Sequence, residues 1–171
     1  MPYVTHQQLE KIPGAKELAR VAGDMHRPAI DPTLMALTLR GEDRSAYSTD
    51  AIAHADDALS RIDAAINESD RLIDGYVGRR YRLPLSLTPD AATTLSGLSR
   101  AITRYKLHTG RISDEKTDPI ARDYQDALRM LREIGDAKFS LGIDDPQTQS
   151  TVPSEVLIDN GHKVFGRKVW P

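Results

Sequence analysis

The sequence has 171 residues, of which 39% are hydrophobic and 28% are charged. These values predict one soluble globular domain, since a disordered chain has less apolar content and a larger net charge. The 23 basic and 25 acidic residues leave a net charge of -2, whereas a protein that coats nucleic acid carries a basic excess. The chain has no cysteine, which excludes disulfide frameworks, zinc fingers, thiol nucleophiles and iron–sulfur clusters.

Large aromatic side chains are scarce, with six Tyr, two Phe and one Trp. The core must therefore be built mainly from aliphatic side chains, which favours packed helices over a β-sandwich. No signal peptide and no run of about 20 apolar residues is visible. We therefore expect a protein that is made in the cytoplasm, stays soluble and has no membrane partner.

Two short helices are predicted near the N-terminus. Thr5 and Gln8 have the spacing of a capping box, which predicts a helix over residues 6–12 that ends at the following Pro-Gly pair. A second short helix is predicted over residues 16–22. Residues 23–48 contain several Gly and Pro residues, and we expect an irregular insertion that holds one short helix.

A long amphipathic helix is predicted over residues 49–77, because apolar residues recur there in alternating steps of three and four. The width of the apolar arc indicates contact with more than one neighbouring helix. Four aspartates lie on the opposite face, and we interpret them as a solvated face in preference to paired catalytic carboxylates. The apolar stripe is Ile52, Ala55, Leu59, Ile62, Ile66, Ser69, Ile73 and Tyr76, and the aspartates are Asp56, Asp63, Asp70 and Asp74.

Two further helices are predicted, one starting at the N-cap Thr88 and ending near residue 109, the other starting at Asp118 and ending near Lys138. The predicted fold is mainly α. Residues 1–140 are predicted to form a helical bundle around one long central helix. Residues 141–171 are predicted to form a linker and an extended C-terminal tail. Asn160-Gly161 lies between two apolar runs and predicts a small β-hairpin in this tail, because both central residues of a tight hairpin turn need positive φ.

The sequence carries no recognisable catalytic or metal-binding motif. The five histidines are not paired at metal-ligand spacing, and there is no His-Glu-x-x-His, EF-hand, Gly-x-Ser-x-Gly or Walker A pattern. We therefore expect no enzymatic activity, no metal and no other cofactor.

Two groups of residues are candidate contact sites for a partner. The densest basic cluster is Arg79, Arg80 and Arg82 around Tyr81. It either contacts phosphates or an acidic neighbouring subunit, or it complements the negative end of the long helix while Tyr81 packs on the bundle.

The C-terminal tail holds two of the three Phe and Trp residues of the chain. Such a tail either folds back as a cap or reaches into a partner, where Trp and Arg are favoured anchors, and we favour the partner. The candidate contact residues of the tail are Val164, Phe165, Arg167, Lys168, Val169 and Trp170.

Several motifs are similar to those of a known family. The most specific is Ile73-Asp74-Gly75-Tyr76 followed by Arg80-Tyr81-Arg82-Leu83-Pro84-Leu85. Ile102-Thr103-Arg104-Tyr105-Lys106-Leu107 and residues 124–134 match two later helices. Over residues 1–22 and 50–142, the chain resembles the head–tail connector proteins of Mu-like tailed phages and prophages.

The resemblance implies a structural virion protein of the neck, at the head–tail interface. It would be an adaptor that forms a ring of twelve copies on the portal protein at the capsid vertex and joins it to the next neck protein. Genomic DNA would pass through its channel without specific binding. The alternative is a small helical DNA-binding packaging protein, whose candidate basic residues are Arg100, Arg104, Arg129 and Arg132. These residues are interspersed with apolar and acidic positions, which disfavours the alternative.

Overall fold

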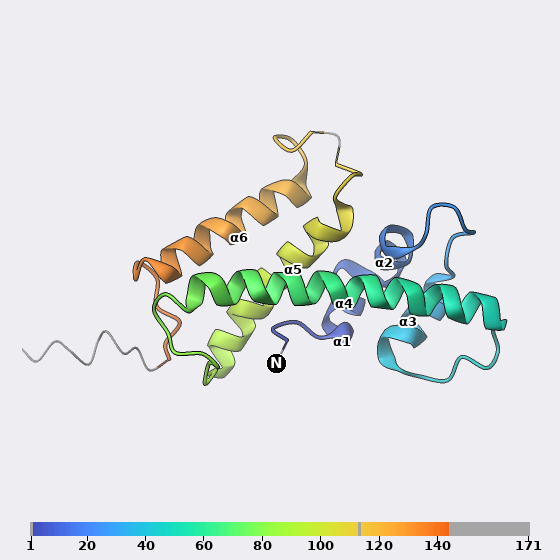
Figure 1. The fold of residues 1–171 in the computed structure, drawn as a ribbon, viewed down its shortest axis with the longest axis horizontal. Coiled ribbons are helices and arrows are strands. Elements are labelled where there is room, and N and C mark those ends of the chain that lie inside the picture. Colours follow the sequence, from blue (N-terminus) through green and yellow to red (C-terminus); the bar gives the residue numbers. More distant parts are fainter. Residues whose placement is uncertain (1, 113, 144–171) are drawn as a thin grey trace, which may run out of the picture.

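The structure is a computed structural model and describes residues 2–112 and 114–143. Helix α4 (Thr49–Val77) runs along the longest axis of the molecule (Figure 1). Near its first half lie α1 (His6–Leu9), η1 (Glu10–Gly14), α2 (Ala15–Ala22) and α3 (Pro32–Arg40). Helix α5 (Pro89–His108) crosses α4, and α6 (Pro119–Gly135) packs on α5 and on the second half of α4.

The mainly α prediction is confirmed, because the part of the chain that the structure describes contains helices and turns but no strand. The β-hairpin predicted around Asn160-Gly161 lies outside the described residues.

Each of the three long helices begins at a side-chain cap, and the caps of α5 and α6 are the predicted ones. Ser48, Thr88 and Asp118 accept hydrogen bonds from backbone amides in the first turns of α4, α5 and α6. Helix α6 ends at Gly135, and its predicted end near Lys138 is wrong. Ala137 has a φ of 61°, which breaks the helical path beyond that point.

The capping box of α1 is confirmed. The amide of Gln8 donates to Oγ1 of Thr5 (3.3 Å), and the amide of Thr5 donates to Oε1 of Gln8 (2.9 Å). The predicted length of this helix is wrong, because α1 ends at Leu9 and the wider turn η1 follows. Ile12 is extended, with φ of -146° and ψ of 115°, as expected for the residue before a proline.

Residues 23–48 contain one short helix, α3, as predicted, but they are more than an irregular insertion. Three apolar side chains of α3 (Leu34, Met35 and Leu39) are buried in the core between α2 and α4. The helix starts at Asp31, which caps it, and ends at Gly41, whose φ is 69°. This segment is therefore a structural part of the bundle.

The apolar stripe of α4 serves two separate cores. The first core is built with α1, α2 and α3 and the second with α5 and α6. The first includes Val4, Leu9, Leu18, Leu34, Met35, Ala55, Ile62 and Ile66. The second includes Ile73, Val77, Tyr81, Leu95, Ile102, Leu131 and Ile134. One continuous helix thus joins two hydrophobic units.

Small polar residues fill the position where α5 crosses α4, between the two cores. The hydroxyl of Thr103 donates to Oγ of Ser69 (2.9 Å), which donates to the carbonyl of Ala65 (2.7 Å). Both hydroxyl-bearing residues are fully buried. Because hydrogen bonds are directional, they fix how α5 crosses α4. The crossing directs the last turns of α5 towards α2 (Figure 1).

Candidate interaction surfaces

The basic cluster at the end of α4 closes the second core. Tyr81 is only 3% exposed, and its hydroxyl accepts a hydrogen bond from the amide of Leu141 (3.1 Å). The guanidinium of Arg80 lies 5.0 Å from the centre of the Tyr81 ring and donates to the carbonyl of Phe139 (2.9 Å). Tyr81 and Arg80 therefore attach the segment after α6 to the end of α4, and Tyr81 packs on the bundle.

The other two cations of the cluster face outwards. Arg79 and Arg82 are exposed, and the Arg79 guanidinium lies 5.1 Å from the centre of the Tyr76 ring. Of the four predicted contact residues here, these two are the exposed ones. The six predicted contact residues of the tail, 164, 165 and 167–170, lie outside the described residues.

An apolar groove next to this cluster was not identified from the sequence. It is lined by Tyr3, Asp74 and the loop between α4 and α5. Leu83 and Leu87 in that loop are 42% and 38% exposed, which is unusual for large apolar side chains. The sequence signal was present in the run Leu83-Pro84-Leu85, but its exposure depends on the path of the loop.

The interpretation of the four aspartates of α4 as a solvated face is only partly right: the side chains of Asp63 and Asp56 are about half exposed, at 47% and 49%, but these residues also make specific contacts. Asp63 contacts Nε2 of His6 (2.6 Å), Asp74 accepts from the Tyr3 hydroxyl, and Asp56 pairs with Arg44. Each acidic side chain thus holds a neighbouring segment against α4. The partners were hidden in the sequence because the Tyr3 and His6 contacts span 71 and 57 residues.

Asp70 contacts two different segments of the chain. Its Oδ1 accepts from the amide of Tyr3 (3.3 Å) and from the hydroxyl of Ser99 (3.2 Å). Burial raises the pKa of the Asp70 carboxyl, and the hydrogen bonds from Tyr3 and Ser99 act in the opposite direction. Burial, followed by the hydrogen bond to Asp74, raises the pKa of the Tyr3 phenol. This arrangement fastens the N-terminal segment to α4 and α5.

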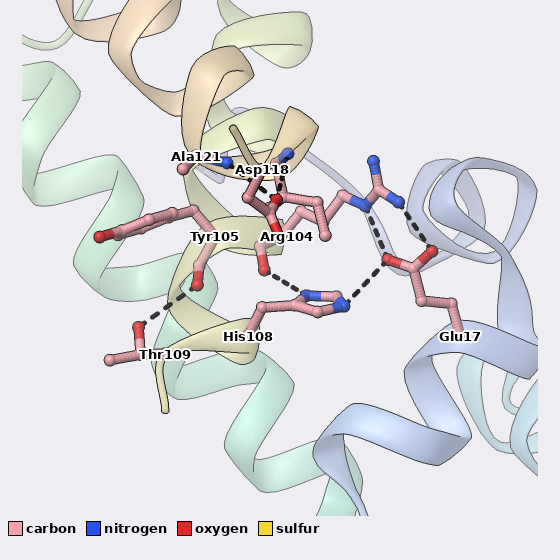
Figure 2. A network of polar contacts seen from close by, with 8 residues as sticks. Glu17, Arg104, Tyr105, His108, Thr109, Asp118 and Ala121 are labelled. Carbon is pink, nitrogen blue, oxygen red and sulfur yellow. Dashed lines mark hydrogen bonds and ion pairs between the residues drawn. The ribbon is translucent and has the colours of Figure 1, made fainter. Parts of the chain in front are cut away.

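A second polar network joins α2 to the end of α5 (Figure 2). Nε and Nη2 of Arg104 donate to the two carboxylate oxygens of Glu17, at 2.6 and 2.9 Å. Nε2 of His108 lies 3.5 Å from the same carboxylate, and Nδ1 of His108 lies 2.8 Å from the carbonyl of Arg104. The hydrogen bond to Glu17 raises the pKa of the Arg104 guanidinium further above its ordinary value.

This network forms one wall of a hollow between η1, α2 and the end of α5. Lys16, Arg20 and Arg111 also line it, together with apolar atoms of Pro13, Val21 and Ile120. From the sequence, Arg104 was considered as a candidate DNA-binding residue, and its proximity to these other cations was not predicted. They come from two helices and a turn, so only the fold places them around one hollow.

Among residues 2–112 and 114–143, no group of three or more His, Asp or Glu side chains is arranged to hold a metal ion. Within the same range, no helix combines the length and the hydrophobicity required to span a bilayer.

Comparison with known proteins gives two matches. Residues 3–159 match the model of a family described as Bacteriophage Mu, Gp36. The chain belongs to this family. It is also 33% identical over 102 residues to the "Mu-like prophage FluMu protein gp36" of Haemophilus influenzae, an alignment that covers 58% of this chain and 66% of that relative. The matched part thus spans just under two thirds of the relative's length.

No solved structure matches the chain. The family match includes every described helix, from α1 to α6, and therefore all the surfaces above. The predicted resemblance to a Mu-like phage family is confirmed.

Proposed function

We propose that this Mu-like phage protein is a structural component of the virion neck. In this proposal it is an adaptor that forms a ring of twelve copies on the portal protein at the capsid vertex and carries the next neck protein. It is made in the bacterial cytoplasm, acts in the virion without enzymatic activity or a cofactor, and has no membrane partner.

One observation carries the proposal: a single 29-residue helix supports two separate hydrophobic cores. Such a helix gives a stiff, elongated subunit whose two ends are built from different elements (Figure 1). An adaptor in a neck needs this property, because it meets one component on the head side and another on the tail side. Family membership supports the same reading.

The C-terminal end of α4 is the better candidate for contact with a different protein. It presents the exposed cations Arg79 and Arg82 and the exposed apolar side chains Leu83 and Leu87. Arginine beside exposed apolar side chains is a composition that protein interfaces favour. Ile143 also packs against the second core, at this end of the molecule, and we propose the residues that follow it, 144–171, as the anchor.

The alternative of a DNA-binding packaging protein has weaker support. Two of its four candidate arginines are engaged within the chain, Arg104 with Glu17 and Arg129 with Asp126 (2.7 Å). A groove-reading helix needs such side chains to reach base edges.

The proposal is tested by mixing the full chain with the portal protein of the same phage and sedimenting the mixture on a gradient. We expect the full chain to co-sediment with the portal and the chain truncated after Ile143 to remain at the top. The truncated chain keeps both cores, so its circular dichroism spectrum and unfolding midpoint should stay close to those of the full chain. If the truncated chain binds the portal as well as the full chain does, residues 144–171 are not the anchor. If neither chain binds, the adaptor function is contradicted.

A further inference from the structure

The hollow between η1, α2 and the end of α5 concentrates positive charge in a chain whose net charge is -2. Its lining includes Lys16, Arg20, Arg104 and Arg111 but only one acidic residue, Glu17. Both oxygens of the Glu17 carboxylate are taken by Arg104 (Figure 2). The single acidic group of the lining is thus already neutralised.

The three other cations that line the hollow have no acidic partner among the residues that the structure describes. Within the described residues, Lys16, Arg20 and Arg111 form no hydrogen bond or ion pair through their side chains. Asp118 and Asp123 also lie near enough to act on Arg104, but neither lines the hollow. Like charges around one hollow repel each other and gain from a shared anion.

The wall of the hollow is held in place before any ligand arrives. Arg104 is fixed by two hydrogen bonds to Glu17. The His108 side chain, 13% exposed, lies between Glu17 and the Arg104 carbonyl. Both ring nitrogens of His108 lie near oxygen atoms, so the ring helps to hold the Glu17 carboxylate in place. A preformed wall lowers the entropy cost of binding.

We propose that this basic hollow binds a phosphate group. A phosphate presents several oxygens and up to two charges in a compact group, which matches cations that converge from α2 and from the turn after α5. Arginine forks suit phosphate geometry, and two of the three free cations are arginines. A carboxylate offers two oxygens and one charge, so it fits three cations less well. The phosphate is either free or part of a nucleic-acid backbone, and the latter would place DNA on this face of the subunit.

The test uses the full chain and a double variant, Arg20→Ala with Arg111→Ala. The control, Arg129→Ala with Arg132→Ala, removes the same charge from the exposed side of α6. Binding of a fluorescent 20-base-pair duplex of arbitrary sequence is followed by anisotropy at several salt concentrations. A thermal-shift titration with inorganic phosphate runs in parallel, and a polyglutamate peptide is the competitor. Circular dichroism checks that each variant is folded.

We expect the double variant Arg20→Ala with Arg111→Ala (the hollow variant) to bind the duplex about tenfold or more weakly than the unchanged chain does. The slope of the logarithm of its binding constant against the logarithm of the salt concentration should be smaller in magnitude by about 2. The control should bind within about twofold of the unchanged chain. Stabilisation by inorganic phosphate that is lost only in the hollow variant, without duplex binding, supports the proposal with free phosphate as the source.

The proposal is overturned if both double variants lose affinity equally, or if the unchanged chain responds to neither phosphate nor duplex. It is also overturned if polyglutamate binds the hollow more tightly than phosphate does, which would indicate an acidic protein partner. These outcomes do not depend on the portal, so they are separable from failure of the adaptor proposal.

Discussion

Asp70 shows how one side chain links the N-terminal segment to two helices. Its carboxyl receives hydrogen bonds from Tyr3 and Ser99 while it sits half-buried near Asp74. Because burial raises its pKa, the folded chain holds the Asp70 proton more tightly than the unfolded chain does. The associated stability is present below the ordinary pKa of aspartate and is lost as the pH rises through the folded-state pKa.

Replacing Asp70 with Asn tests this sign. The amide oxygen can still accept from Tyr3 and Ser99, but the buried charge is removed. We expect the stability of Asp70→Asn relative to the unchanged chain to increase as the pH rises from about 4 to about 7. Urea unfolding at several pH values measures this difference. Asp123→Asn, at an exposed site on α6, is the matched change. A difference for Asp70→Asn that is the same at every pH would contradict the assignment.

At the scale of elements, Gly135 controls how α6 approaches the end of α4. A Cβ at this position would lie 2.9 Å from the carbonyl oxygen of Tyr76, closer than real side chains come. Gly97, inside α5, has nothing within 4 Å of the equivalent point. The two glycines therefore have opposite structural roles, although both lie in helices.

We expect Gly135→Ala to destabilise the chain by about 1–3 kcal/mol, because the two backbones must move apart. Gly97→Ala should instead stabilise it by about 0.5–1 kcal/mol, because alanine favours a helix and meets no neighbour. Chemical denaturation of both variants measures the two changes. Equal effects of the two substitutions would show that the approach of α6 to α4 is not tight.

The starts of α5 and α6 could be predicted because their caps, Thr88 and Asp118, act on amides two or three residues away. Features that depend on other segments could not. The buried side chains of α3 and the role of Gly135 follow from packing between elements.

The whole molecule is organised by α4, whose apolar stripe was predicted but whose division into two cores was not. The division occurs at Ser69, which accepts a hydrogen bond from Thr103 of α5, 34 positions later in the sequence. The basic cluster around Tyr81 was predicted with two alternatives left open. The structure buries Tyr81 and exposes Arg79 and Arg82, so the cluster is partly structural and partly available for contact.

The basic hollow belongs to the same scale. Lys16 and Arg111 are 95 positions apart in a chain of 171 residues, and only the packing of α2 on α5 brings them to one place. Sequence patterns with local periodicity cannot reveal such a site. Contacts of this kind also explain why a nearly neutral net charge does not describe the local surface.

The adaptor function is tested most directly by electron microscopy of necks purified from phage particles, with the copy number of this chain measured by quantitative mass spectrometry. We predict a closed ring of helical subunits between the portal and the next neck component, with twelve copies of the chain and the long axis of α4 traceable in each subunit. A neck whose density is fully explained by other proteins, or particles that lack this chain, would contradict the account.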